Sequence, residues 1–199
     1  MENNLVEKKL TSEMIYDGKV LHIYKDQVTL PNGHTALREV MRHVGAVCMV
    51  VLTEDNRVVV ERQFRYPVDS VITEIPAGKL DSKSEDHEAA ARRELWEETG
   101  ITAKDWKYLG TIYPAAAYTD EVLYIYLARD LTFGERHLDE DEFLDVELVK
   151  IEDLVEEILA GKIPDSKTQV SIMRVYHMLK NGLLYMKTRC AKAQRDFSP

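Results

Sequence analysis

Three glutamates near the middle of the chain have the spacing of a possible metal site. Glu94, Glu97 and Glu98 are three and four positions apart, so in a helix of 3.6 residues per turn they share one face. Like charges at this spacing destabilise a helix by about 0.2–0.5 kcal/mol per pair. A hard divalent cation, which prefers oxygen ligands, would offset that repulsion. The charges alone also fit a solvated acidic face in which Arg92 and Arg93 form ion pairs.

The flanking residues favour the metal site. Gly78 and Glu85 precede the run Arg93-Glu94-Leu95-Trp96-Glu97-Glu98-Thr99-Gly100-Ile101. This segment resembles the box of the Nudix hydrolases, in which a glycine and a glutamate are followed, after seven intervening residues, by Arg-Glu-aliphatic-x-Glu-Glu-x-Gly-aliphatic. Every fixed position from Glu85 to Ile101 matches, whereas six residues separate Gly78 from Glu85 in place of the family's five. The extra residue alters the glycine end of the loop and leaves the carboxylates in the family's pattern.

The resemblance implies a metal-dependent pyrophosphatase. Such a reaction requires neutralising charge on two phosphates, directing a water in line and stabilising the departing phosphate. The implied ligands of Mg²⁺, or of Mn²⁺ in its place, are the Ala77 carbonyl and the carboxylates of Glu94, Glu97 and Glu98. Glu98 and Arg93 would take part in catalysis, with Arg93 orienting the carboxylates.

A longer resemblance, over roughly residues 15–185, is to the ADP-ribose pyrophosphatase branch of the family. It implies hydrolysis of ADP-ribose to AMP and ribose 5-phosphate. Arginine suits such a substrate because its planar fork holds phosphate oxygens with two hydrogen bonds. Matched by position, the implied substrate-binding residues are Arg38, Glu39, Arg65, Glu121 and the aromatic Tyr118.

Two other functions stay open at this point. After Tyr113-Pro114 the branch commonly has a second proline and a glycine, but this chain has Ala115-Ala116-Ala117. The substrate could therefore be another nucleoside diphosphate sugar, such as GDP-mannose. A non-catalytic domain that binds a nucleotide as a regulator is the second alternative, and the intact glutamates of the box argue against it.

The net charge of −9 is concentrated in two windows. Residues 81–98 carry seven acids against three bases, and residues 135–147 carry seven acids against one base. An acidic chain disfavours nucleic acid and anionic membranes as partners. The second window predicts a mobile acidic loop, Asp139-Glu140-Asp141-Glu142. By resemblance Glu140 is the general base and Glu142 a further metal ligand, although their roles could be exchanged.

Hydrophobic patterning predicts an α/β fold. Pro31-Asn32-Gly33 lies between strand-like segments and indicates a hairpin, while the apolar run 44–52 is typical of a strand buried on both faces. Ser82-Lys83-Ser84-Glu85 fits a capping box for a helix over residues 85–99, which Gly100 would end. Strands are also expected at 20–24, 27–30, 36–42, 57–64, 71–75, 106–113, 121–127 and 144–150, and helices at 151–160 and 168–181. Together with the resemblance, this order predicts a Nudix α/β/α sandwich with mixed sheets and an N-terminal β extension.

The expected organisation has three parts. Residues 1–43 form an N-terminal β segment that contributes to a homodimer, residues 44–187 form the Nudix hydrolase domain, and residues 188–199 form a flexible tail. No signal peptide or membrane-spanning run is evident, so we expect a cytoplasmic enzyme of a small nucleoside diphosphate sugar. Cys48 and Cys190 form no disulfide pattern, and the six histidines lack zinc-site spacing.

Overall fold

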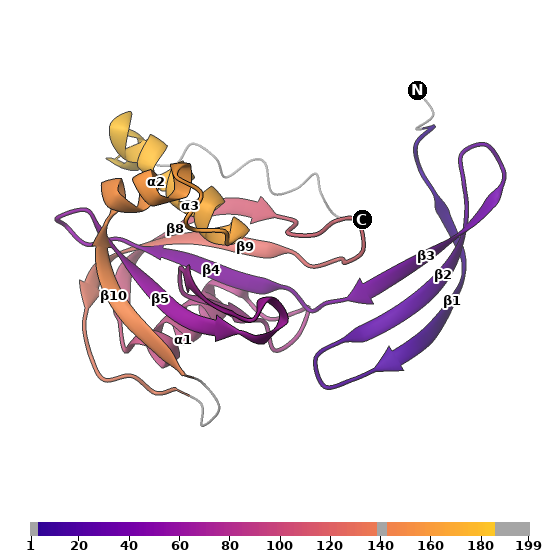
Figure 1. The fold of residues 1–199 in the computed structure, drawn as a ribbon, viewed down its shortest axis with the longest axis horizontal. Helices are drawn as coiled ribbons and strands as arrows, with labels where there is room; N and C mark the ends of the chain where they lie inside the picture. The colour runs from indigo at the N-terminus through magenta and orange to yellow at the C-terminus, as the bar shows by residue number, and fades with distance from the viewer. Residues whose placement is uncertain (1–3, 139–142, 186–199) are drawn as a thin grey trace.

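The computed structural model describes residues 4–138 and 143–185, and it begins with a separate antiparallel sheet. Its strands are β1 (Lys8–Asp17), β2 (His22–Thr29) and β3 (Thr35–Arg42), in the order β1-β2-β3. In Figure 1 this sheet lies beside the rest of the molecule and joins it through the end of β3. The hairpin between β2 and β3 confirms the turn predicted at residues 31–33.

The strand β1 was not predicted from the sequence. All of its residues are exposed, so its sequence carries no alternation of buried and exposed positions from which a strand could be recognised. Residues 20–24 and 27–30 were predicted as two strands, whereas the structure has the single strand β2.

The body of the molecule contains two sheets. One has the order β7-β4-β9-β8, in which β4 and β9 are parallel and the other pairs are antiparallel; the second is antiparallel with the order β10-β5-β6. The strand bounds are β4 (Ala46–Val51), β5 (Arg57–Arg65), β6 (Ser70–Glu74), β7 (Ala77–Lys79), β8 (Thr102–Ile112), β9 (Leu123–Thr132) and β10 (Leu144–Lys150), with a 3-10 turn at Tyr66–Val68.

Helices cover the central strand β4 from both sides. Alternate residues of β4 belong to two hydrophobic clusters: Val47 and Met49 pack with α1 (His87–Thr99), whereas Cys48 and Val50 pack with α2 (Ile151–Leu159) and α3 (Ser166–Lys180). A last 3-10 turn spans Leu183–Tyr185. The strand buried on both faces and the α/β/α sandwich with mixed sheets are therefore confirmed (Figure 1).

The predicted start of α1 is wrong by two residues. The helix begins at His87, because the side chain of Asp86 accepts a hydrogen bond from the Ala89 amide at 2.8 Å and acts as the N-cap. Glu85 is not part of a capping box, since its carboxylate accepts the Asp81 amide at 2.6 Å and closes the preceding loop. The end is as predicted: Gly100 has φ +70°, a left-handed conformation that glycine adopts without strain.

Several other boundaries differ from expectation, the largest difference being at the end of β9, which runs to Thr132 rather than residue 127. β8 begins at Thr102 rather than residue 106, and α3 begins at Ser166 because Asp165 caps it. Residues 77–79, expected as part of a loop, form the short strand β7 against β4. Among residues 4–138 and 143–185, no helix is long and apolar enough to cross a membrane. The predicted tail, 188–199, lies outside the described residues, as do Glu140 and Glu142.

Candidate active site

The carboxylates predicted to bind metal are gathered by the arginine beside them. On α1, the Arg93 guanidinium donates to Glu94 Oε1 at 2.8 Å and to Glu97 Oε2 at 3.1 Å. Its other terminal nitrogen lies 3.5 Å from Glu85 Oε1 and donates to the Lys79 carbonyl at 3.4 Å. Arg93 therefore ties the acidic face of α1 to the loop before it.

Burial and charge act in opposite directions on Arg93. Burial by itself lowers the pKa of the guanidinium, but the neighbouring carboxylates, first among them Glu94, raise that pKa above its usual value. The side chain is thus a permanent cation within the acidic group. It limits the repulsion between the glutamates while no metal is bound.

Glu98 lies deeper than the other carboxylates and meets the strand β7. Its side chain is buried, and Oε2 accepts a hydrogen bond from the Ala77 amide at 3.2 Å. The next residue, Gly78, approaches Glu94 so closely that a Cβ atom there would be 1.9 Å from the Glu94 carboxyl carbon. A side chain at residue 78 would therefore displace the Glu94 carboxylate, and the two contacts bring Ala77 and the glutamates together.

These residues fit a divalent metal by their chemistry. The donors are carboxylates and a backbone carbonyl, which are hard oxygen ligands of the kind that Mg²⁺ and Mn²⁺ take. The Glu94 carboxylate occupies the space that a side chain at residue 78 would take, directly against the backbone of β7. Within the described part of the chain, no three acidic, histidine or cysteine groups are already arranged as a metal cluster. In this arrangement the Arg93 guanidinium occupies the space between Glu94 and Glu97.

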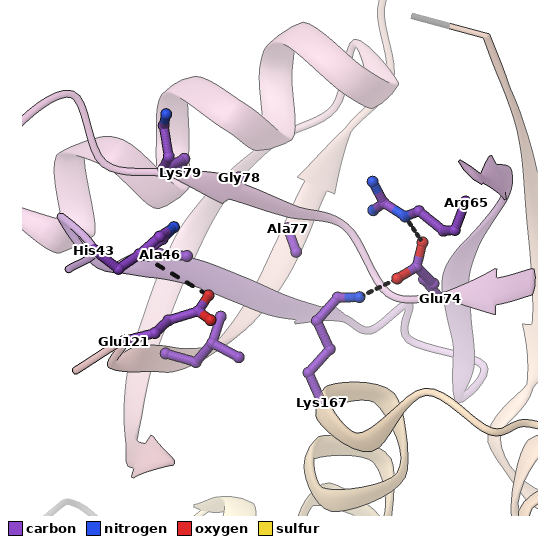
Figure 2. A pocket seen from close by; sticks show the side chains of 10 residues that line it. His43, Ala46, Arg65, Glu74, Ala77, Gly78, Lys79, Glu121 and Lys167 are labelled. Atoms are coloured by element: carbon purple, nitrogen blue, oxygen red, sulfur yellow. Dashed lines mark hydrogen bonds and ion pairs between the residues drawn. The ribbon is translucent and has the colours of Figure 1, made fainter. Parts of the chain in front are cut away.

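A cleft of about 300 Å³ lies next to this segment (Figure 2). It is lined by Ala77, Gly78 and Lys79 of β7 together with residues from several other elements: His43, Ala46, Arg65, Glu74, Glu121, Leu123 and Lys167. Two predicted substrate-binding residues, Arg65 and Glu121, thus lie in the same cleft as the predicted metal ligand Ala77. Basic side chains on its wall make it suited to an anionic ligand.

One wall of the cleft is a network of buried charges. Glu74, at the end of β6, accepts a hydrogen bond from Arg65 Nε at 2.6 Å and pairs with the Lys167 ammonium. The Lys167 ammonium also lies 3.2 Å from Asp165 Oδ1. Figure 2 shows the Glu74 carboxylate between its two cationic partners. Both buried side chains, Glu74 and Lys167, are therefore paired, as buried charges require.

The opposite wall carries Glu121 and His43. His43 Nδ1 lies 3.9 Å from Glu121 Oε1 and accepts the Gly45 amide at 3.0 Å, while the His43 amide donates to Asp120 Oδ1 at 2.7 Å. Burial alone raises the pKa of Asp120, but the His43 amide and the cations Lys83 and Arg42 lower it below its usual value. Asp120 is thus an anion that fixes the backbone beside the cleft.

The other predicted substrate-binding residues do not line the cleft of this chain. Arg38 and Glu39 are exposed on β3, and Arg38 forms an ion pair with Glu7, including a hydrogen bond of 2.9 Å from its Nε. The Tyr118 ring is exposed, on the connection between β8 and β9 that meets the end of β3. That junction is made by the Met41 amide, which donates to the Tyr118 carbonyl at 2.8 Å.

Sequence reasoning assigned no role to three polar cleft residues that form ion pairs or lie close to one, namely His43, Glu74 and Lys167. Glu74 belongs to the segment 74–78, which resembles the family branch. That resemblance gives no indication of the residues with which Glu74 pairs. Lys167 is 93 positions away from Glu74, and no local pattern connects residues that far apart. His43 was set aside because the histidines lack zinc-site spacing.

Comparisons with known proteins agree with this geometry. Residues 41–169 match the NUDIX domain, and residues 7–41 match the nucleoside diphosphate sugar hydrolase N-terminal domain. An ADP-ribose pyrophosphatase of Bacillus subtilis is 40% identical over 92% of this chain and 99% of its own length. A methanol dehydrogenase activator of Bacillus methanolicus is 39% identical over 89% of this chain and 95% of its own. A crystal structure of an ADP compounds hydrolase has the same fold, with a TM-score of 0.77 at 22% identity over 89% of this chain and 97% of that one.

Proposed function

The chain belongs to the Nudix hydrolase family, and from that premise we propose that it hydrolyses ADP-ribose to AMP and ribose 5-phosphate. One observation carries the proposal. The Ala77–Gly78 segment that meets the glutamates of α1 also lines the cleft that holds Arg65 and Glu121. A diphosphate in this cleft would lie between oxygen ligands for a metal on one side and cationic side chains on the other.

Nudix hydrolases use a divalent metal, and we propose Mg²⁺, with Mn²⁺ as a substitute. The Ala77 carbonyl, Glu94, Glu97 and Glu98 would hold it. When bound, the metal neutralises phosphate charge and makes a water more acidic. Arg93 keeps the carboxylates in place through its contacts with Glu94 and Glu97. By the family pattern, Glu140 would accept the proton of the attacking water and Glu142 would be a further ligand.

The cleft residues would bind the two ends of the substrate. Arg65 would hold the diphosphate, because its terminal guanidinium nitrogens form paired hydrogen bonds with phosphate oxygens. Glu121 would accept hydrogen bonds from the hydroxyls of the terminal ribose, and it lies beside His43 on one wall of the cleft. Tyr118 would stack on a base or ribose at the edge of the site.

We also propose that the chain acts as a homodimer in the cytoplasm. The N-terminal sheet exposes large apolar side chains: Leu10, Met14, Ile15, Tyr16 and Leu37. Exposed apolar side chains gathered on one element typically mark an interface. In a dimer that covers it, Arg38 and Glu39 would reach the cleft of the partner and contact the nucleotide there.

A substrate panel tests the specificity. We expect the kcat/KM for ADP-ribose with Mg²⁺ to exceed that for GDP-mannose and other nucleoside diphosphate sugars. A higher kcat/KM for another sugar would overturn the substrate and keep the reaction. A protein that binds the nucleotide but cleaves none of the panel would instead be the regulator considered as an alternative, and the intact glutamates of α1 argue against that outcome.

A further inference from the structure

A buried lysine forms part of the cleft wall without a role in the family pattern described above. Lys167 lies in the first turn of α3, and only 9% of its surface is exposed. Removing an ammonium group from water is costly unless it is paired. Its partners are Glu74 and Asp165, at the point where α3 meets the end of β6. A buried cation is thus placed beside a cleft suited to an anion.

Glu74 connects this lysine to Arg65. One Glu74 oxygen contacts Lys167 and the other accepts from Arg65 Nε at 2.6 Å. Because Glu74 holds Nε, the Arg65 guanidinium cannot rotate freely about the bonds of its own side chain. In Figure 2 the two terminal nitrogens of Arg65 lie on the side away from Glu74, which leaves them to face an incoming phosphate.

The same turn of α3 also fixes the chain that leads to the metal ligands. Thr168 Oγ1 accepts the Ile75 amide at 2.9 Å, and Asp165 Oδ2 accepts both the amide and the hydroxyl of Thr168, at 2.9 and 2.6 Å. The first turn of α3 therefore holds two consecutive residues, Glu74 and Ile75, shortly before Ala77. Lys167 is the cationic member of this attachment.

We propose that Lys167 is a positioning residue for diphosphate binding. It holds Glu74 so that Arg65 presents both terminal nitrogens to the cleft. Without Lys167, the Glu74 carboxylate is free to turn and engage the terminal nitrogens of Arg65 itself. This inference rests on the proposed function, in which Arg65 binds the diphosphate.

A double-mutant cycle tests the proposal. Lys167→Met should raise the KM for ADP-ribose about tenfold, the effect of losing one charge-assisted interaction, and should change kcat much less. Arg65→Ala should raise KM at least as much, and adding Lys167→Met to it should cause no further rise. Lys167→Arg should restore most of the affinity.

The matched control is Lys180→Met. Lys180 is on the same helix and pairs with Glu152 at 3.4 Å, but it is exposed. The kinetics of this variant should equal those of the wild type.

Other outcomes would overturn the proposal. If the two changes raise KM additively, or if Lys167→Met matches the control, Lys167 does not act through Arg65. Should Lys167→Met fail to fold, Glu74→Gln replaces it in the cycle, with the same rise in KM and the same absence of additivity expected. If ADP-ribose stays intact but another nucleoside diphosphate sugar is cleaved, the proposed substrate fails and the cycle is measured on that sugar. If no such compound is cleaved, both proposals fail.

Discussion

The cleft region and the N-terminal sheet of this chain are built in opposite ways. Around the cleft, charged side chains are buried and joined across distant parts of the sequence, as Glu74 is to Lys167. In the N-terminal sheet, every residue of β1 is exposed and apolar side chains such as Ile15 face solvent. A site that must position phosphate groups needs closely packed supports, whereas in the homodimer proposed above the open sheet would gain its packing from a second copy.

The largest effect is expected at the buried carboxylate of the cleft region. Glu98→Gln keeps the size of the side chain and its contact with the Ala77 amide but removes the charge that would bind metal. We expect kcat to fall by about 100- to 1,000-fold, with an unchanged circular dichroism spectrum and a similar Tm. Activity close to that of the wild type would show that Glu98 is not a metal ligand.

The next largest loss of activity is expected when a side chain is added at residue 78, beside Glu94. In Gly78→Ala the new methyl group would lie 1.9 Å from the Glu94 carboxyl carbon, so the carboxylate must move. We expect kcat/KM to fall about 100-fold or less, in line with displaced metal-site geometry. Because the loss of activity would arise from the displaced Glu94 carboxylate, adding Gly78→Ala to Glu94→Ala should lower kcat/KM little further. Additive losses measured by steady-state kinetics would contradict this explanation.

Arg93→Lys tests the group that holds the carboxylates together. Lysine keeps the positive charge but has no planar fork, and Arg93 contacts Glu94, Glu97 and Glu85 at once. We expect about a tenfold fall in kcat and a higher Mg²⁺ concentration for half-maximal rate. Arg92→Lys is the matched control, since Arg92 pairs with the exposed Glu88 on the same helix. An equal effect of the two changes would count against an orienting role for Arg93.

In the N-terminal sheet the expected effect is on assembly. Ile15→Asp places a charge on the exposed apolar face of β1, which is unfavourable if a second copy covers that face. Light scattering coupled to gel filtration should give a dimer mass for the wild type and a monomer mass for the variant. A wild-type monomer would refute the proposed homodimer, and a variant dimer would place the interface elsewhere.

The smallest effect is expected for a thiol in the core. Burial raises the pKa of Cys48 to about 11, so below pH 9 the thiol stays protonated and unreactive. In a Cys190→Ser background, Ellman's reagent at pH 8 should label native protein hardly at all and unfolded protein fully. Rapid labelling of the native protein would mean that the core opens readily. The core and the exposed N-terminal sheet would then differ less in their packing.

Local patterns predicted the parts of the fold that have local causes. The apolar run 44–52 marked the central strand because both of its faces are buried, and the acidic segment marked α1 and its end at Gly100. The start of α1 was mistaken because two capping candidates stand close together, and Glu85 is used by the Asp81 amide instead. The strand β1 escaped prediction because it has no buried side.

In the candidate site, too, residues close in sequence could be predicted and contacts between distant segments could not. The acidic face of α1 and its arginine could be predicted because they are neighbours in sequence, and Arg65 and Glu121 could be matched by position. The attachment of Lys167 to Glu74 could not, because it depends on where α3 packs against the end of β6. The N-terminal residues Arg38 and Glu39 could be named from the family pattern, yet in the proposed homodimer their place in a site would depend on a second copy of the chain.

The central claim is that the metal-binding face of α1 and the adjoining cleft cleave the diphosphate of ADP-ribose. Its most direct test is a time course of the purified protein with ADP-ribose and Mg²⁺, with products separated by chromatography. The account predicts AMP and ribose 5-phosphate in equal amounts, and no products when EDTA replaces the metal. Intact ADP-ribose in the presence of Mg²⁺, or unchanged cleavage in EDTA, would contradict it.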